Sequence, residues 1–425
     1  MKQSSSSEVT SKGSSGTPST VNQRLNRGDI HWILALYGTA VGAGTLFLPI
    51  NAGIGGIWPL LLIALLAFPV TFFAHRGLTR FILAGAEQGD RDLTDTLKRF
   101  FGPTWGKLLT GLYFFAVFPI LLVYSVAITN TVESVLVNQI GIDPLPRSLL
   151  SLVLIGILVF IAKGGQRVIL RVMSFLVYPF IAALVVLALL LIPHWKGDFL
   201  ATAHQPIHMG HMITTLWLAI PVMVFSFNHT PMISAFSVAQ RERYGENAEP
   251  RSARLLAVAH LLMVVTVIFF VVSCLMTVSP ANLVDAEHQN VSMLSYLADY
   301  LHTPVIAIAA PIIALVAISK SFLGHYIGAR EGFRGLMGNG SRRMDLLVTL
   351  FMFLCCWGVS ALNPSILGLI ESLGGPVIAL LLFLVPMAAI TFVPAMARYK
   401  GASSNIFVVI IGLIAVSATF YGFVG

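Results

Sequence analysis

Long apolar stretches separated by short polar segments run along nearly the whole chain. Eleven of them reach the length of about 20 residues that a helix needs to cross a hydrocarbon core of about 30 Å. They cover residues 31–53, 57–79, 105–137, 147–164, 168–192, 211–237, 254–278, 304–328, 345–362, 365–391 and 404–424. The pattern predicts an all-α integral membrane protein with 11 transmembrane helices, whose transmembrane domain covers residues 29–425.

Two of these spans are interrupted by helix-breaking residues. The first contains GTAVGAGTLFLP at residues 38–49, and the sixth contains WLAIPVMVFSFNHTP at residues 217–231. An unpaired backbone N–H or C=O in hydrocarbon costs several kcal/mol, so a break is tolerated only where it is buried in protein or lines a cavity. Secondary transporters build their substrate sites from such breaks near the middle of the bilayer. The pattern therefore indicates a carrier.

The spacing of the two breaks predicts an internal repeat. They lie in spans one and six, and an odd repeat length of five inverts the second set in the membrane. We expect an inverted 5+5 repeat of residues 29–192 and 211–391, with 404–424 as one extra C-terminal helix. Residues 1–28 are polar and Ser-rich without the apolar core of a signal peptide, so they are predicted to be a disordered tail.

Composition and charge exclude a soluble domain and explain the basic balance. Of 425 residues, 56% are hydrophobic and 10% charged, against about 25% charged in soluble domains. With the N-terminus cytoplasmic, all of the 26 lysines and arginines except Arg147 and Lys196 fall on the inner side, if Lys320 inside a span is counted there. The positive-inside rule thus accounts for the net charge of +8 without a nucleic-acid partner. Eleven spans place the C-terminus on the outer side of the membrane. The expected partners are the lipid bilayer and a small-molecule amino acid, with no required protein partner.

The first break predicts an anion site. Free backbone N–H groups at the start of a half-helix, together with the helix dipole, attract a carboxylate. We therefore expect the substrate to bind at the residues of this break, namely Thr39, Gly42, Ala43, Gly44 and Thr45. The alternative is a close helix–helix contact through the small residues of Gly38-x-x-x-Gly42.

Polar residues of the sixth and third spans are further substrate candidates. Ser226, Asn228 and His229, with Phe225 beside them, offer donors and acceptors that suit an amino group or a side-chain hydroxyl. Alternatively they satisfy backbone groups that the two prolines release. In the middle of the third span, the adjacent Tyr124 and Ser125 either face the substrate or pack against neighbouring helices.

Ionisable residues inside spans indicate proton or ion paths, because charge in the membrane is expensive. Lys320 either couples a proton or fills the place of a sodium ion, unless it only extends to the inner interface. Glu371, before a Gly-Gly-Pro run, either has a structural role or takes part in gating and proton coupling. Glu133, near the outer end of its span, either relays protons, pairs with a base or is a solvated residue of the mouth. His75 and Arg76 end the second span and are interpreted as interfacial anchors rather than relays.

Several motifs are absent. The sequence contains no Gly-x-x-x-x-Gly-Lys-Ser/Thr phosphate loop and no His-Glu-x-x-His zinc motif. Its three cysteines all lie in apolar runs, where small buried hydrophobic residues are expected. We predict no enzymatic activity, no catalytic residues, no bound metal and no cofactor apart from the coupling ion, which is H⁺ with Na⁺ as the alternative.

The two broken segments also carry a family resemblance. At residues 38–49 and 223–231, and again at 73–78, 122–134, 320–326 and 363–367, the chain resembles the hydroxy/aromatic amino acid permeases of the amino acid–polyamine–organocation superfamily. The resemblance implies a LeuT-type fold, the bacterial inner membrane and import of L-serine by proton symport. Asn228-His229 is similar to the serine branch, since the threonine branch tends to carry Phe after the Asn, whereas Thr230 departs from the Ser of the serine branch. Threonine, another small hydroxy or thiol amino acid, and sodium coupling stay open.

Overall fold

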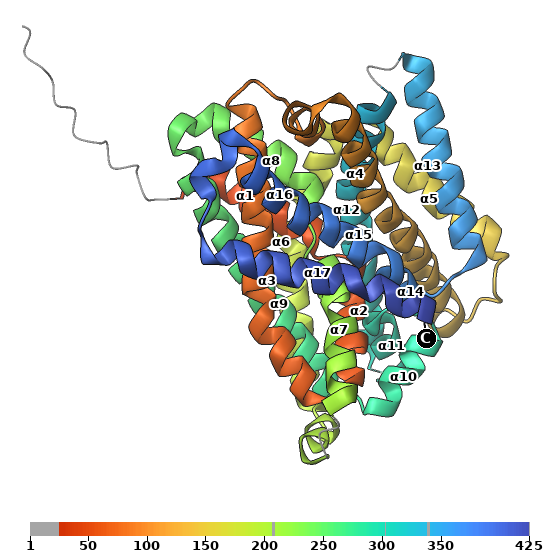
Figure 1. The fold of residues 1–425 in the computed structure, drawn as a ribbon. Coiled ribbons are helices and arrows are strands. Elements are labelled where there is room, and N and C mark those ends of the chain that lie inside the picture. The colour runs from red at the N-terminus through yellow and green to blue at the C-terminus, as the bar shows by residue number, and fades with distance from the viewer. Residues whose placement is uncertain (1–24, 206–208, 302, 338–340, 425) are drawn as a thin grey trace, which may run out of the picture.

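The computed structural model describes residues 25–205, 209–301, 303–337 and 341–424. All regular secondary structure in this part of the chain is helical, without a strand (Figure 1). The helices are α1 Arg27–Ala40, α2 Ala43–Ile54, α3 Ile57–Ala86, α4 Leu93–Ser134, α5 Arg147–Lys163, α6 Gln166–Leu191, α7 Met209–Ser226, α8 Thr230–Tyr244, α9 Ala248–Thr277, α10 Pro280–His288, α11 Met293–Tyr300, α12 Pro304–Met337, α13 Arg342–Leu362, α14 Ile366–Leu369, α15 Gly375–Ala379, α16 Val385–Phe392 and α17 Ser403–Val424. Short π-helical segments occupy Val135–Gln139, Ile370–Gly374 and Leu380–Leu384, and 3₁₀ turns occupy Ile192–His194, Asp198–His204, Gly245–Asn247 and Pro394–Tyr399.

The helices are long and apolar enough for a membrane protein. Within the described residues, 7 helices could span a bilayer by length and composition, or up to 8 when α1 and α2, bent by 56° at their break, count as one span. Two shorter apolar helices, Met212–Ser226 and Ser403–Ala418, accompany them. Each of the eleven predicted ranges falls on helix, and the all-α membrane class is confirmed.

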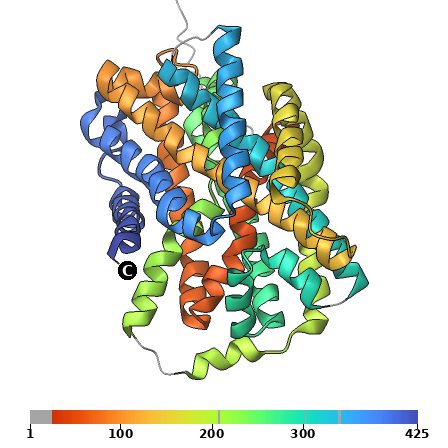
Figure 2. The same cartoon turned by 90° about the vertical axis from the view of Figure 1, so that its right-hand side faces the viewer.

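The broken helices lie inside the bundle. Residues 36–50 around the first break and 219–234 around the second are buried, whereas α13 and α17 lie on the outside (Figures 1 and 2). The most extensive packing contact between two helices joins α12 to α4, and α3 also packs along α9. Large apolar side chains on the outer helices are left uncovered, among them Phe160 and Phe175, each 78% exposed. Uncovered apolar surface of this kind suits contact with lipid rather than water.

Two predicted boundaries differ from the structure. The second span was expected to end at residue 79, but α3 continues to Ala86, so His75 is only 1% exposed and lies within the bundle. The prediction that His75 is an interfacial anchor is therefore wrong; Arg76, next to it, pairs with Glu249 at 3.4 Å. The third span was expected from residue 105, whereas α4 begins at Leu93 and kinks at Gly102, whose φ is 78°. A positive φ of this size suits glycine, so the chain can change direction there.

A helical loop covers one end of the broken pair. Between the seventh and eighth predicted spans, α10 and α11 form where no element was predicted, and both pack against α2. Ser279 caps α10 in a capping box with Asn282, and the side chain of Ser292 caps α11. Side-chain caps of this kind stabilise short helices by about 1 kcal/mol each. Both helices lie at the end of the molecule away from the N-terminus (Figures 1 and 2).

Candidate functional site

The two helix breaks lie side by side. Val41 and Gly42 separate α1 from α2, and residues 227–229 separate α7 from α8. The hydroxyl of Thr45, in the first turn of α2, donates to the carbonyl of Ser226, the last residue of α7, at 3.1 Å. Segments 181 residues apart in the sequence therefore share one buried point, as expected for paired breaks.

Lys320 holds the end of α1. Its Nζ donates to the carbonyl oxygen of Gly38 at 2.9 Å and also to that of Val41, and it lies 4.1 Å from the ring centre of Phe180 in α6. The lysine is fully buried and forms no ion pair with a carboxylate of the described residues. A cation at a helix C-terminus is favoured by the dipole and by free carbonyl groups. The contact also shows that Lys320 does not extend to the interface.

The same face of α12 connects both breaks. One position after Lys320, the Ser321 hydroxyl donates to Val41 O at 3.2 Å. One turn further, His325 Nδ1 lies 2.9 Å from Ser321 O, and Asn228 Nδ2 lies 3.3 Å from His325 Nε2. Since a carbonyl only accepts, Nδ1 of His325 carries the hydrogen and Nε2 accepts from Asn228. The Asn228 Oδ1 in turn accepts from the hydroxyl of Thr230 at 2.7 Å and from its backbone N–H at 3.2 Å, at the first residue of α8.

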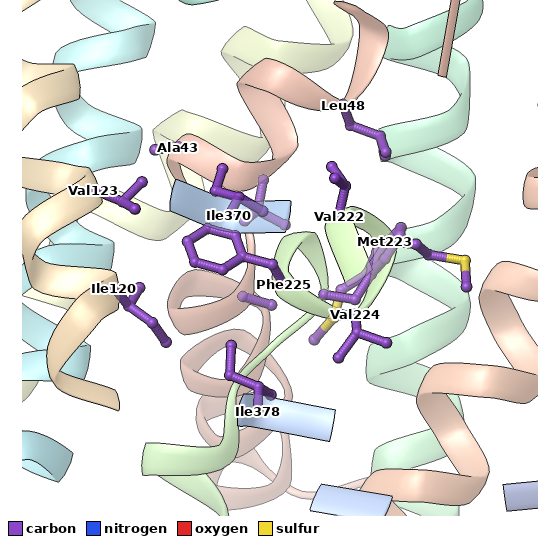
Figure 3. Close-up of a cluster of buried hydrophobic side chains, with 14 of the residues drawn as sticks. Ala43, Leu48, Ile120, Val123, Val222, Met223, Val224, Phe225, Ile370 and Ile378 are labelled. Atoms are coloured by element: carbon purple, nitrogen blue, oxygen red, sulfur yellow. The ribbon is translucent and has the colours of Figure 1, made fainter. Parts of the chain in front are cut away.

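Glycine at the first break is required by close packing. A Cβ at Gly42 would overlap the side chain of Ser321 and come within 3.1 Å of the Tyr124 hydroxyl, and a Cβ at Gly44 would overlap Phe225. Figure 3 shows the Phe225 ring among apolar side chains of α2, α4 and the α14–α15 region. The Tyr124 ring makes edge contacts with Phe225 and His325, at 6.2 and 5.4 Å between ring centres. These side chains surround the α2 N-terminus, where the first N–H groups have no helical partner.

The structure brings some predicted site residues together and separates others. Gly42, Ala43, Gly44, Thr45, Tyr124, Phe225, Asn228 and Lys320 lie around the two breaks. The hydroxyls of three predicted residues donate to carbonyls of their own helices: Thr39 to Ala35, Ser125 to Leu121 and Ser226 to Val222.

Two further predicted residues point elsewhere. The His229 ring stacks on His75 of α3, whereas the neighbouring Asn228 faces α12. Glu371 is half-buried and accepts from Asn51 Nδ2 of α2 at 2.7 Å. The carboxyl group belongs to the π-helical segment Ile370–Gly374 and contacts α2 through this one amide partner.

A large cavity approaches the breaks from the basic end. It has a volume of about 1060 Å³ and is lined by α1, α4, α8 and α12, with Trp32, Arg91, Ser234, Arg330 and Glu331 among its walls. Ser234 lies one turn beyond Thr230 on α8, so the cavity ends about 6 Å along the helix from the second break. The Ser234 hydroxyl donates to Glu331 at 3.2 Å in this wall.

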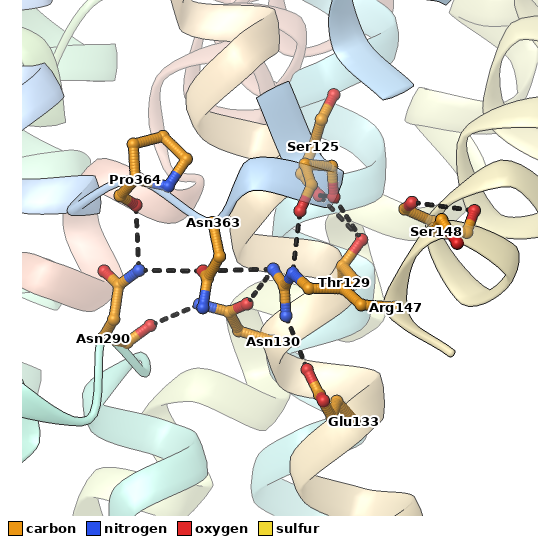
Figure 4. Close-up of polar contacts among 11 residues, drawn as sticks. Ser125, Thr129, Asn130, Glu133, Arg147, Ser148, Asn290, Asn363 and Pro364 are labelled. Carbon is orange, nitrogen blue, oxygen red and sulfur yellow. Dashed lines mark hydrogen bonds and ion pairs between the residues drawn. The ribbon is translucent and has the colours of Figure 1, made fainter. Parts of the chain in front are cut away.

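The opposite end is tied together by a network around Arg147. Its guanidinium contacts Glu133 Oε2 and Asn130 Oδ1, both at 2.5 Å, the Ser360 carbonyl at 2.8 Å and Asn363 Oδ1 at 3.1 Å. Figure 4 shows these groups converging with Asn290, which contacts Asn363 and the carbonyl of Pro364. The network joins α4, α5, α13 and the α10–α11 loop. The large cavity thus lies at one end of the bundle, and the Arg147 network joins helices at the other.

Several residues of this arrangement were not predicted from the sequence. Ser321 and His325 lie on the face of α12 that carries Lys320. The spacing of Lys320, Gly324 and His325 in the sequence could have indicated this shared helix face. Arg147 was recognised only as a basic residue on the unexpected side. Its ion pair with Glu133 confirms the alternative that this acid pairs with a base.

Comparison with known proteins identifies the family. A sequence profile of the tryptophan/tyrosine permease family matches residues 30–422. The chain belongs to the tryptophan/tyrosine permease family. This confirms the predicted membership among the hydroxy/aromatic amino acid permeases, and the prediction that the chain is a transporter rather than an enzyme.

Relatives of this permease are similar over nearly their full length. It is 56% identical over 405 residues to the serine transporter SdaC of Escherichia coli strain K12 and to that of strain O157:H7, and 55% identical to that of Shigella flexneri. Each alignment covers 92% of this chain and 94% of the relative. The permease is therefore a multi-pass membrane protein homologous to bacterial serine transporters.

Proposed function

We propose that this permease imports L-serine across a bacterial inner membrane by proton symport. The choice of serine is supported by relatives named serine transporters at 56% identity over 92% of the chain. The choice of a proton is supported by one observation, the buried Nζ of Lys320 bound to carbonyl groups at the first helix break. An amine at that position can bind and release a proton, whereas a sodium site there would need oxygen ligands in its place.

The proposal includes an eleven-span LeuT-type topology with an inverted 5+5 repeat. It is supported by helix in all eleven ranges and by the contact between the breaks of spans one and six. It is also supported by arginines of separate segments that gather around Glu87 and Glu249 at one end, namely Arg76, Arg80, Arg241 and Arg398. By the positive-inside rule that end is cytoplasmic, so the N-terminus is inside and the C-terminus is periplasmic. The cavity at the basic end then opens to the cytoplasm. Residues 1–24 of the predicted cytoplasmic tail lie outside the described residues.

The substrate would bind across both breaks. Its carboxylate would accept from the free N–H groups of Ala43 and Gly44 at the start of α2, where the dipole favours negative charge. Its amino group and hydroxyl would meet polar groups of the second break and the Tyr124 hydroxyl. A site that hydrogen-bonds a substrate hydroxyl rejects an analogue without it by about 10⁴-fold or more, but discriminates one extra methyl group by only about 1–3 kcal/mol. Alanine should therefore be excluded more strictly than threonine.

Coupling would use the protonation of Lys320. A neutral amine has two N–H groups, matching the carbonyls of Gly38 and Val41, whereas an ammonium adds a third donor and a charge. The two forms would favour different arrangements of the α1–α2 break, and only such a difference in affinity can couple proton to substrate. Glu371, at the contact with Asn51, is the second proposed proton-coupling group.

The test is uptake of labelled L-serine by purified protein in proteoliposomes. An inward proton gradient and an inward sodium gradient would be imposed separately, with empty liposomes as the control. Accumulation above equilibrium under the proton gradient is the expected result. Accumulation only under the sodium gradient would show that the coupling ion is Na⁺ and not H⁺. Unlabelled threonine, cysteine or D-serine that inhibits uptake of labelled serine more strongly than unlabelled serine does would identify another substrate. No accumulation under either gradient would contradict serine symport.

A further inference from the structure

Three buried imidazoles form a cluster behind the second helix break. His75 comes from α3, His229 from the break itself and His260 from α9, and none is more than 1% exposed. One ring nitrogen from each lies within 4.8 Å of the others. Imidazoles enclosed together in an apolar bundle are costly unless their polar atoms are paired.

The hydrogen bonds fix which nitrogen of each ring carries the hydrogen. Nδ1 of His75 lies 2.8 Å from Thr71 O, Nδ1 of His260 lies 2.7 Å from Leu256 O, and Nδ1 of His229 lies 3.0 Å from Phe227 O. A carbonyl only accepts, so each Nδ1 donates and each Nε2 presents a lone pair.

The three lone pairs are not equally occupied. The Nε2 of His75 accepts from the backbone N–H of His229 at 3.4 Å, and the Nε2 of His260 lies 3.4 Å from Nδ1 of His75. The Nε2 of His229 is buried without a hydrogen-bond partner among the described residues. A buried acceptor left unpaired costs about 1–3 kcal/mol, and such a group needs an explanation.

Ring orientation disfavours a metal ion at this cluster. The rings of His75 and His229 are stacked, with centres 3.7 Å apart and planes within 6° of each other. An imidazole binds a metal along a lone pair that lies in the plane of its ring. The lone pairs of two stacked rings run in parallel planes and do not converge on one point. A proton needs only one lone pair, and the free Nε2 of His229 supplies it.

We propose that Nε2 of His229 is a proton-binding site that is empty in the arrangement described here and filled in the other arrangement of the α7–α8 break. The titratable groups that face His229 are the imidazoles of His75 on α3, His260 on α9 and His325 on α12. A proton on His229 would add a donor without an acceptor and a charge beside these rings. Both effects oppose protonation in the present packing.

The position of His229 links this proton to the break. It is the N-cap residue of α8, with φ −137° and ψ 26°, and its backbone N–H donates to His75. A change in the break must therefore move the ring relative to His75 and His260. This inference rests on the proposed function in one respect, since alternating access supplies the second arrangement.

The experiment is a ring-nitrogen NMR titration of the substrate-free permease with ¹⁵N-labelled histidine, from about pH 8 to about pH 5, the range in which histidine can switch charge. The His229 signal is assigned by its absence from His229→Gln, or from His229→Asn if the first variant does not fold. We expect this signal to move from the neutral to the protonated shift, and its midpoint to change when serine is added. The control is the signal of exposed His204, assigned with His204→Gln, whose midpoint should not respond to serine.

Two results would overturn the inference. One is a His229 signal that keeps its neutral shift down to about pH 5, and the other is a midpoint that is the same with and without bound serine. Failure of the proposed function is seen separately, as absent proton-driven serine accumulation by the wild-type protein in proteoliposomes. Proton-driven accumulation together with a non-titrating His229 would overturn this inference alone.

Discussion

Lys320 and Val41 are 279 positions apart in the chain, and the Nζ of the one donates to the backbone carbonyl of the other inside the bundle. This single contact ties α12 to the point where α1 stops being helical. A side chain that changes charge there acts directly on the break.

Replacing Lys320 separates coupling from binding. We expect Lys320→Ala to abolish serine accumulation driven by a proton gradient, because no group at the α1 break then binds the proton, while serine exchange across the membrane persists. The measurement is uptake by proteoliposomes under a gradient and under equilibrium exchange. The matched control is Lys196→Ala, which removes a lysine that contacts Tyr300 outside the bundle. Normal accumulation by Lys320→Ala would remove this residue from the mechanism.

The close approach at Gly42 predicts a rescue. Gly42→Ala puts a methyl group onto the Ser321 side chain, and overpacking costs about 1–3 kcal/mol. We expect serine affinity to fall about tenfold or more, and to recover in part in Gly42→Ala/Ser321→Gly, where the obstructing side chain is gone. Binding of labelled serine to purified protein measures both effects. Gly156→Ala is the control, since a Cβ there meets nothing within 4 Å; no recovery in the double variant would contradict the steric argument.

Asn228 has two separable roles. Its Oδ1 accepts from the hydroxyl and the N–H of Thr230, and its Nδ2 donates to His325. Asn228→Ala loses all three contacts and should destabilise the protein by about 1–3 kcal/mol, whereas Thr230→Val removes only the hydroxyl donor and should cost less. Thermal unfolding in detergent gives the order of the two variants. Asn282→Ala, in the capping box of α10, should lower stability without changing serine affinity. An unfolding midpoint as low for Thr230→Val as for Asn228→Ala would argue against a separate role of the Asn228 Nδ2.

The Arg147 network predicts unequal effects for its two charged members. Glu133→Gln removes one partner, but Arg147→Met removes contacts to Glu133, Asn130, Ser360 and Asn363 together. We expect the arginine variant to lower the unfolding midpoint more. In the double variant, the coupling between the two charges should be about 1 kcal/mol or less, because both side chains are partly exposed. A larger loss for Glu133→Gln than for Arg147→Met would show that the ion pair dominates the network.

Glu371 offers a test that preserves its contact. Glu371→Gln keeps an oxygen that accepts from Asn51 but cannot exchange a proton. If the carboxyl group takes part in coupling, accumulation in a proton gradient should fall while the free energy of unfolding stays within about 0.5 kcal/mol of the wild type. Transport and thermal unfolding of the same preparation decide it. Unchanged accumulation would leave Glu371 a structural role only.

Sequence reasoning worked best where the signal was local. Glycine and proline within apolar runs marked both breaks, since these residues interrupt a helix wherever they occur. It failed at His75, because the apolar run fades at residue 79 while α3 continues for about two more turns to Ala86. Tertiary packing sustained a helix that the hydrophobic pattern did not mark, and a predicted interfacial residue became an internal one.

The sequence by itself determined that this chain is a helical membrane protein, where its helices break and which end carries the positive charge. Each of these follows from composition and from spacing along the chain. Only the tertiary structure decided that Lys320 meets the end of α1 and that His75, His229 and His260 form one cluster. It also decided that the network around Arg147 joins α4, α5, α13 and the α10–α11 loop. The reason is physical: these contacts join residues far apart in sequence, and burial rewards them only once the helices have packed.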